Sequence, residues 1–220
     1  MSLLNQIKTL VHKDIRLEWR SKHAINSILL YVVSTVFVCY QAFKSIESPA
    51  VWNALFWIIL LFASITAISR SFVQESQYRQ LYYYTIASPK AIILSKIIYN
   101  LLLMLFLALI AYFVYAIIFK MTVAEPALYL VAVILGGSSF ATVFTMVSGI
   151  SAKTGNNSTI MAILAFPIII PILILLIELS KKALMGMETA SSTKEILVLI
   201  AINVITMTIS LLLFPYLWRD

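Results

Sequence analysis

The stretch IIYNLLLMLFLALIAYFVYAIIF, residues 97–119, defines the kind of fold this chain adopts. Among its 23 residues the amide Asn100 is the most polar group, and none is charged. A helix needs about 20 apolar residues to cross the ~30 Å hydrocarbon core of a bilayer. A transmembrane β-strand would instead show ~10 residues of alternating polarity. The stretch does not alternate, so it predicts a membrane-spanning helix.

The remaining composition extends this prediction to the whole chain. Hydrophobic residues make up 62% of the 220 residues and charged residues 11%, whereas a soluble domain carries about 25% charged residues. We therefore expect an all-α polytopic membrane protein, with residues 1–220 forming a single transmembrane domain. The apolar runs predict six transmembrane helices, at about 24–43, 51–69, 91–119, 127–150, 158–177 and 195–217.

The distribution of Lys and Arg predicts the orientation. With six spans, eleven of the sixteen basic residues fall on the side of the two termini and five on the other side. Excess Lys and Arg mark cytoplasmic loops, so both termini and the 70–90 segment are expected in the cytoplasm, and the 178–194 segment outside. The net charge of +7 is explained in the same way, and we do not expect nucleic-acid binding. No cleavable signal peptide is apparent, so the first span is expected to direct insertion.

The N-terminal segment, residues 1–23, predicts an amphipathic helix in the headgroup plane, with Arg16 and Arg20 on its charged face toward anionic lipid. Asp14 and Glu18 instead fall within its apolar arc, where free contact with lipid would be unfavourable. They either meet a partner protein or pack against the chain's own bundle. Both alternatives remain open from the sequence.

The segment RSFVQESQYRQLYYYTIASP, residues 70–89, is the expected ATPase-coupling element. Its aromatic residues suit either a protein interface or the lipid headgroups, and a plain connector is a third reading. The candidate coupling residues are Arg70, Phe72, Glu75, Arg79, Tyr82, Tyr83 and Tyr84. Ser88 followed by Pro89 predicts the start of the third span, because serine caps helices and proline suits the first helical position.

Two of the later spans carry features of their own. In the fifth, Pro167 and Pro171 each remove a backbone donor, which predicts a kink, a break or a re-entrant shape. In the fourth, small residues lie on one face and predict close helix packing, with a substrate-lining role as the alternative. They are Ser138, Thr142, Thr145 and Gly149. Asn100 and Asn203 are expected to form hydrogen bonds between helices, and Lys96 to extend toward the cytoplasmic surface.

Several kinds of chemistry are not supported by the sequence. The two histidines, His12 and His23, both precede the first span, and Cys39 is the single cysteine. No metal, cofactor or catalytic residue is therefore expected in this chain. Paired carboxylates within a span, which proton-coupled carriers use, are missing. The P-loop pattern is also missing, so any ATP would have to be hydrolysed by another subunit.

Taken together, these features resemble an ABC-2-type permease. KDIRLEWR (residues 13–20), FVQESQYRQLYYYTIASPKAIILSK (72–96) and FPIIIPILIL (166–175) resemble, in order, motifs of the CcmB family, the membrane subunit of the haem-exporter-like ABC complex of cytochrome c maturation. The 70–96 segment departs from many members, since Glu75 is its single acidic residue and it has no glycine. This departure bears on the charge of the partner's matching surface.

The resemblance implies a dimeric permease in the bacterial inner membrane, docked on a CcmA-like ATPase that binds the ATP. Through CcmC-like and CcmE-like haem-handling proteins, the complex would deliver haem or release the haem-loaded chaperone. Two other functions remain open. The chain would otherwise be an ABC-2-type exporter of a lipid-like or amphipathic substrate, or a membrane scaffold that does not transport.

Overall fold

The computed structural model describes residues 2–21, 23–43, 48–69, 87–119, 123–153, 158–186 and 189–217. In these residues the chain forms seven α-helices and one short 3₁₀ helix. Their bounds are α1 Leu3–Ser21, α2 His23–Phe43, α3 Pro49–Ile68, α5 Pro89–Phe119, α6 Pro126–Lys153, α7 Ser158–Met185, η1 Thr189–Ser192 and α8 Thr193–Leu217. The all-helical class predicted from the sequence is confirmed.

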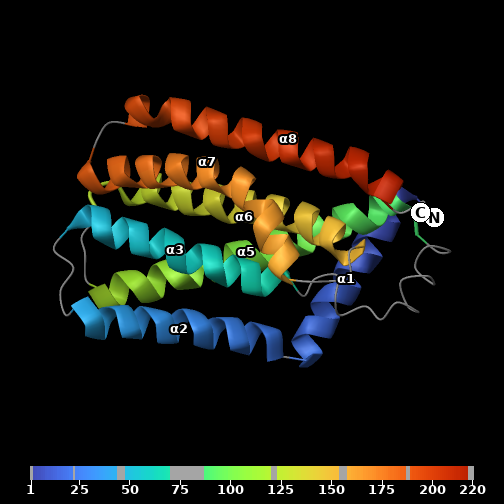
Figure 1. The fold of residues 1–220 in the computed structure, drawn as a ribbon, viewed down its shortest axis with the longest axis horizontal. Helices are drawn as coiled ribbons and strands as arrows, with labels where there is room; N and C mark the ends of the chain where they lie inside the picture. The colour runs from blue at the N-terminus through green and yellow to red at the C-terminus, as the bar shows by residue number, and fades with distance from the viewer. Residues whose placement is uncertain are drawn as a thin grey trace.

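Six of the helices form a bundle, and the seventh crosses one of its ends. Figure 1 shows α2, α3, α5, α6, α7 and α8 running along the long axis, with α2 and α8 at opposite edges. α1 crosses obliquely at the end where both termini lie. We call this end of the bundle the terminal end and the opposite one the far end.

Within the described residues, five helices are long and apolar enough to cross a membrane. They are Pro49–Ile68, Pro89–Phe119, Pro126–Ala152, Thr159–Met185 and Thr193–Tyr216. The first expected span falls on α2, whose apolar described part, Ile28–Phe43, is shorter. The count of six spans therefore stays a prediction.

Proline and serine mark where helices begin, as the sequence indicates. α5 begins at Pro89 and α6 at Pro126. In the first turn of α5, the Ala91 backbone N–H donates to Ser88 Oγ at 3.3 Å. This contact satisfies one of the donors that a helix start leaves unpaired. The expected start of the third span is thus confirmed.

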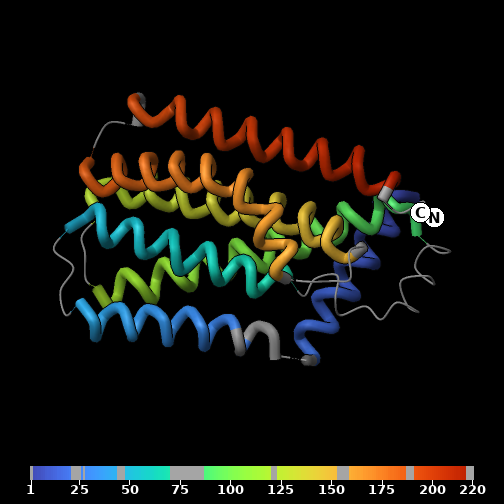
Figure 2. Tube along the Cα trace, in the orientation of Figure 1, coloured from blue at the N-terminus to red at the C-terminus, as the bar shows by residue number. Residues whose placement is uncertain are grey.

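Of the three shapes expected for the fifth span, the structure shows the kink (Figure 2), and the helix is longer than expected. α7 is neither broken nor re-entrant at Pro167 and Pro171, because it is one continuous helix over Ser158–Met185. It does change direction along its length (Figure 2), as a kink at proline would produce. α7 also continues eight residues past the expected end at 177. Part of the 178–194 segment is therefore a helical extension, and η1 follows it.

An aromatic cluster fills the far end of the bundle. Trp52 and Phe56 of α3 pack against Tyr115 of α5 and Tyr129 of α6, with ring centroids of Trp52 and Tyr115 4.8 Å apart. All four side chains are almost fully buried. The Tyr115 hydroxyl donates to the backbone oxygen of Trp52 at 2.9 Å. This cluster joins three helices at the far end, and a smaller apolar cluster of Ile92, Ile93, Ile97 and Phe214 lies at the terminal end.

Candidate functional site

The seven expected coupling residues all lie outside the described part of the chain. Arg70, Phe72, Glu75, Arg79 and Tyr82 to Tyr84 belong to the segment 70–86, which the structure does not describe. The chain is described again from Ala87, directly before α5. The candidate site therefore consists of described residues that follow this segment in the chain, at the start of α5, and of the residues of α1 that contact them.

α1 is joined to the start of α5 by the side chain of Gln6. The backbone N–H and the hydroxyl of Ser88 both donate to Gln6 Oε1, at 3.2 Å each. Ser88 is the residue immediately before α5. The first turn of α1 is thus hydrogen-bonded to Ser88, the residue directly before α5.

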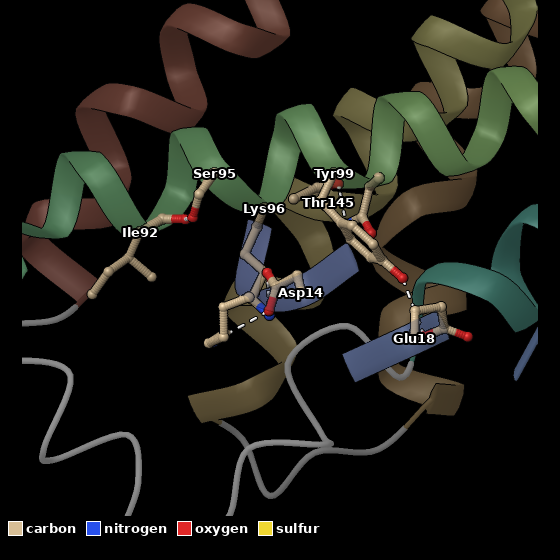
Figure 3. Close-up of polar contacts among 9 residues, drawn as sticks. Asp14, Glu18, Ile92, Ser95, Lys96, Tyr99 and Thr145 are labelled. Carbon is tan, nitrogen blue, oxygen red and sulfur yellow. Dashed lines mark hydrogen bonds and ion pairs between the residues drawn. The ribbon is translucent and has the colours of Figure 1, made fainter. Parts of the chain in front are cut away.

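An ion pair forms the second contact between α1 and α5. Lys96 Nζ lies 3.2 Å from Asp14 Oδ2, and Lys13 Nζ lies 3.2 Å from Asp14 Oδ1 (Figure 3). Asp14 and Lys96 are both buried. The expectation that Lys96 extends to the cytoplasmic surface is wrong, because its ammonium group pairs with Asp14 inside the protein.

A hydrogen bond one turn further along both helices completes the junction. The Tyr99 hydroxyl donates to Glu18 Oε2 at 3.1 Å (Figure 3). Asp14 and Glu18 are four residues apart and Lys96 and Tyr99 three apart, spacings that place side chains on one face of a helix. We call these four residues, with Gln6 and Ser88, the α1–α5 junction.

The junction decides between the two readings of the acidic residues in α1. Asp14 and Glu18 are buried against the chain's own α5, so α1 packs on its own bundle at this face. Arg16 and Arg20, by contrast, are exposed on α1. Part of the apolar arc of α1 packs against α5. Asp14 and Glu18 lie in that part, because Lys96 and Tyr99 of α5 are their partners.

A second group of polar contacts continues from α5 into the bundle. Asn100 Nδ2 donates to Thr145 Oγ1 of α6 at 2.9 Å, next to the junction (Figure 3). On another side of α6, Asn203 Nδ2 of α8 donates to Ser139 Oγ at 2.8 Å, and Thr142 Oγ1 donates to Asn203 Oδ1 at 3.2 Å. The expected interhelical roles of Asn100 and Asn203 are confirmed.

The small-residue face of α6 is divided between neighbouring helices. Thr145 contacts α5 and Thr142 contacts α8, while the Ser138 hydroxyl donates to the backbone oxygen of Leu135 within α6. Gly149 is buried. These contacts are the kind that close helix packing requires.

The sequence did not indicate several residues of the site. Gln6, Tyr99 and Ser139 carry contacts between helices, yet the sequence does not distinguish them from the other polar residues nearby. The available signal for Tyr99 was its place beside Asn100 and one turn from Lys96, within a mostly apolar span. For Gln6 and Ser139 we find no signal of this kind.

The site is suited to joining helices rather than to bond chemistry. Its contacts are the ion pairs of Asp14 with Lys96 and Lys13 and the hydrogen bonds of Gln6 and Glu18, all within the same chain. Among the described residues, no group of three or more His, Cys, Asp and Glu side chains could hold a metal ion. The arrangement joins α1 to α5, and the Asn100 side chain joins α5 to α6.

The fold and the site define an integral membrane protein with a helical bundle and an N-terminal helix fixed to its terminal end. Residues 5–216 match the sequence model of the CcmB protein family, so the chain belongs to the CcmB family. Membership makes it a haem-exporter-like membrane component of cytochrome c biogenesis. No curated protein matches the chain.

Proposed function

We propose that this chain is the membrane subunit of an ATP-driven complex in cytochrome c biogenesis. A separate CcmA-like ATPase hydrolyses ATP, and the chain converts that cycle into haem delivery or into release of a haem-loaded CcmE-like chaperone. The observation that carries this proposal is the family match over residues 5–216, nearly the whole chain. The complex contains two copies of the chain, with CcmC-like and CcmE-like proteins as further partners.

The arrangement of the terminal end supports a coupling role for it. The 70–86 segment precedes α5 directly, and α5 is bonded to α1 at Ser88, Lys96 and Tyr99. A force on that segment would therefore reach α5 and α1 together. Close-packed protein interiors have low compressibility, so a displacement of one buried side chain is transmitted to its neighbours. In this proposal the terminal end faces the cytoplasm and the protein lies in the bacterial inner membrane.

The docking step is tested by reversing charges in the 70–86 segment. The double variant Glu75→Arg/Arg79→Glu, expressed with the CcmA-like ATPase and purified in mild detergent, should retain less ATPase than the unchanged chain. Lys181→Glu is the matched control, because Lys181 is exposed on α7 toward the far end. Equal ATPase recovery from the double variant would contradict docking at this segment.

The energy-coupling step is tested through the partner. An ATPase that binds but does not hydrolyse ATP should still co-purify with the chain, while the yield of haem-loaded cytochrome c falls. Full yield without hydrolysis would overturn the energised function. It would favour a role for the chain as a scaffold.

A further inference from the structure

α1 carries a row of basic side chains along its exposed surface. Lys8, His12, Arg16 and Arg20 follow one another at intervals of four residues, and all four are exposed. Side chains four residues apart lie one above the other on a helix. The four residues therefore form one stripe along α1, which we call the basic stripe.

The α1–α5 junction leaves this surface without a balancing acid. α1 also contains Asp14 and Glu18, but both are buried where they contact α5. Among the residues that the structure describes at the terminal end, no acidic side chain is exposed, whereas Glu125 and Glu178 are exposed toward the far end. The exposed surface of α1 is therefore complementary to an anion.

A groove of about 510 Å³ lies between α1 and α5 at the first half of the basic stripe. Lys8 and His12 line it, together with Ile98 of α5 and with apolar side chains of α1 such as Leu4 and Val11. Leu4 is 76% exposed. The groove thus places two basic side chains directly beside an exposed apolar surface.

The apolar surface continues along α5 beyond this groove. Ile15 of α1 lines the groove and also a neighbouring one, where it lies with Trp19 of α1 and with Leu102 and Phe106 of α5. Ile98, Leu102 and Phe106 are four residues apart and all exposed, so they form one apolar row on α5. α5 runs from the terminal end toward the far end (Figure 1). The row therefore leads from the basic stripe into the part of the bundle that crosses the membrane.

We propose that the groove binds an anionic phospholipid. The Lys8 ammonium group and an imidazole N–H of His12 donate to oxygens of the headgroup phosphate. One acyl chain lies along Ile98, Leu102 and Phe106. The sequence predicted a general attraction of α1 to anionic lipid, and the groove now supplies a site with defined residues.

Charge and apolar surface together select this occupant. An acidic protein surface would also meet the cations, but it would leave the neighbouring Leu4 and Trp19 side chains, which are 76% and 74% exposed, without an apolar partner. A phospholipid covers the charged and the apolar surface at the same time. The proposal goes beyond the proposed function, because it does not depend on the ATPase.

The experiment measures which lipids the full chain retains. The protein is reconstituted in nanodiscs with equal amounts of phosphatidylglycerol, phosphatidylethanolamine and phosphatidylcholine, and is then extracted in mild detergent. Native mass spectrometry counts the bound lipids. Phosphatidylglycerol should be retained about fivefold more than either of the other two, the factor that one basic residue near an anionic surface supplies.

The decisive comparison is between two double variants of the same stripe. Lys8→Gln/His12→Gln removes the basic groups that line the groove and should abolish the preference for phosphatidylglycerol. Arg16→Gln/Arg20→Gln is the matched control, because it changes two exposed residues of the stripe outside the groove, and it should keep most of the preference. All four positions are exposed, so both variants should fold, which thermal unfolding in detergent checks.

A third variant tests the apolar row without changing any charge. Ile98→Trp, which fills the groove beside Lys8, should lower the retention of phosphatidylglycerol. Unchanged retention in this variant would contradict the path given to the acyl chain.

Three further results would overturn the proposal. The first is equal retention of the three lipids by the unchanged protein. The second is an equal loss of preference in the two double variants, which would assign the effect to the charge of the whole stripe. The third is unchanged lipid retention by Lys8→Gln/His12→Gln with lower recovery of the CcmA-like ATPase, which would assign the surface to a protein partner. A failed lipid preference leaves the tests of docking and ATP hydrolysis as they stand.

Discussion

Asp14 and Lys96 bring opposite charges together where neither is well exposed to water. Desolvating two charges is costly, and their attraction offsets that cost only when the geometry is good. Here Lys96 Nζ and Lys13 Nζ both lie 3.2 Å from an oxygen of Asp14. Removing the carboxylate would leave a buried ammonium group beside a second cation. The pair is therefore more important for where α1 lies than for total stability.

Asp14→Asn should destabilise the protein by about 3 kcal/mol, because removing one partner of a buried ion pair typically costs 3–5 kcal/mol. Thermal unfolding in detergent measures the loss as a lower Tm. The double variant Asp14→Asn/Lys96→Met removes both charges and should recover much of it, because neutral replacements of buried pairs are often tolerated. A double variant as unstable as the sum of the single variants would show that the two side chains do not interact.

Gly136 and Gly137 are adjacent glycines with different surroundings. A Cβ atom on Gly136 would overlap the Trp57 ring, lying 2.6 Å from its Cη2 atom. A Cβ atom on Gly137 would lie 3.5 Å from Leu105 Cδ2, an ordinary contact. The Trp57 indole is itself held in place, since its N–H donates to Ser180 Oγ at 2.8 Å. Gly136 therefore makes room for a ring that cannot easily move.

Gly136→Ala should cost about 1–3 kcal/mol through overpacking and should shift the tryptophan fluorescence as the Trp57 ring is displaced. Gly137→Ala is the matched control and should be neutral or slightly stabilising, because alanine is the better helix former. Melting temperatures of the two variants compare them directly. Equal effects would mean that α6 tolerates a methyl group against Trp57.

At the scale of the element, α1 combines two surfaces that a single hydrophobic arc cannot describe. Leu4 and Trp19 are exposed, and Asp14 and Glu18 are buried. Helical periodicity places Asp14 and Glu18 in the apolar arc of α1, where contact with lipid would be unfavourable. It cannot show that a second helix covers this part of the arc. The assignment changes once α5 supplies Lys96 and Tyr99. Periodicity predicted that α1 is a helix, but not which of its faces is covered.

α7 shows how proline acts in a membrane helix. Its two internal prolines remove backbone donors without ending the helix, which is the general behaviour of proline in membrane helices. The C-terminal part of α7 is then bonded to α3, where Asn53 Nδ2 donates to the backbone oxygen of Ile177 at 3.0 Å. The bend visible in Figure 2 thus precedes a part of the helix that is anchored to the core.

The variant Pro167→Ala/Pro171→Ala should straighten α7. Spin labels are attached to cysteines introduced at Thr159 and Lys181 in a Cys39→Ala background. Pulsed electron paramagnetic resonance then measures the distance between the two labels along α7. A straight helix of this span measures about 33 Å at 1.5 Å per residue. The unchanged prolines should give a shorter distance, and the variant one that approaches the straight value. Pro215→Ala in α8 is the control and should leave the distance unchanged.

At the scale of the whole molecule, the two termini lie at one end of the bundle (Figure 1). The aromatic cluster lies at the other end, together with Lys182, which pairs with Glu195 Oε1 at 2.8 Å and so joins α7 to α8. At the terminal end, polar contacts fix α1 and an apolar cluster of Ile92, Ile93, Ile97 and Phe214 joins α5 to α8. Aromatic rings and one ion pair hold the far end.

The predicted orientation is tested with single cysteines in a Cys39→Ala background. Ser2→Cys and Lys181→Cys are both at exposed positions, and they lie toward opposite ends of the bundle. In intact spheroplasts, a membrane-impermeant maleimide should label the Lys181→Cys variant. The Ser2→Cys variant should react only after the spheroplasts are lysed. The reverse pattern would place the terminal end outside and contradict the charge-based orientation.

The membrane class and most helix ends follow from the sequence because their causes are local. Apolar runs such as 97–119 must lie in lipid or a core wherever they fold, and Ser88-Pro89 starts a helix through its own backbone chemistry. The partners of Asp14, Glu18 and Trp57 are residues 81 to 123 positions away along the chain. Only the assembled bundle brings such groups within hydrogen-bond distance. The paths of α1 and α7 therefore came from the tertiary structure, which buries the acids of α1 and lets a proline-containing helix continue.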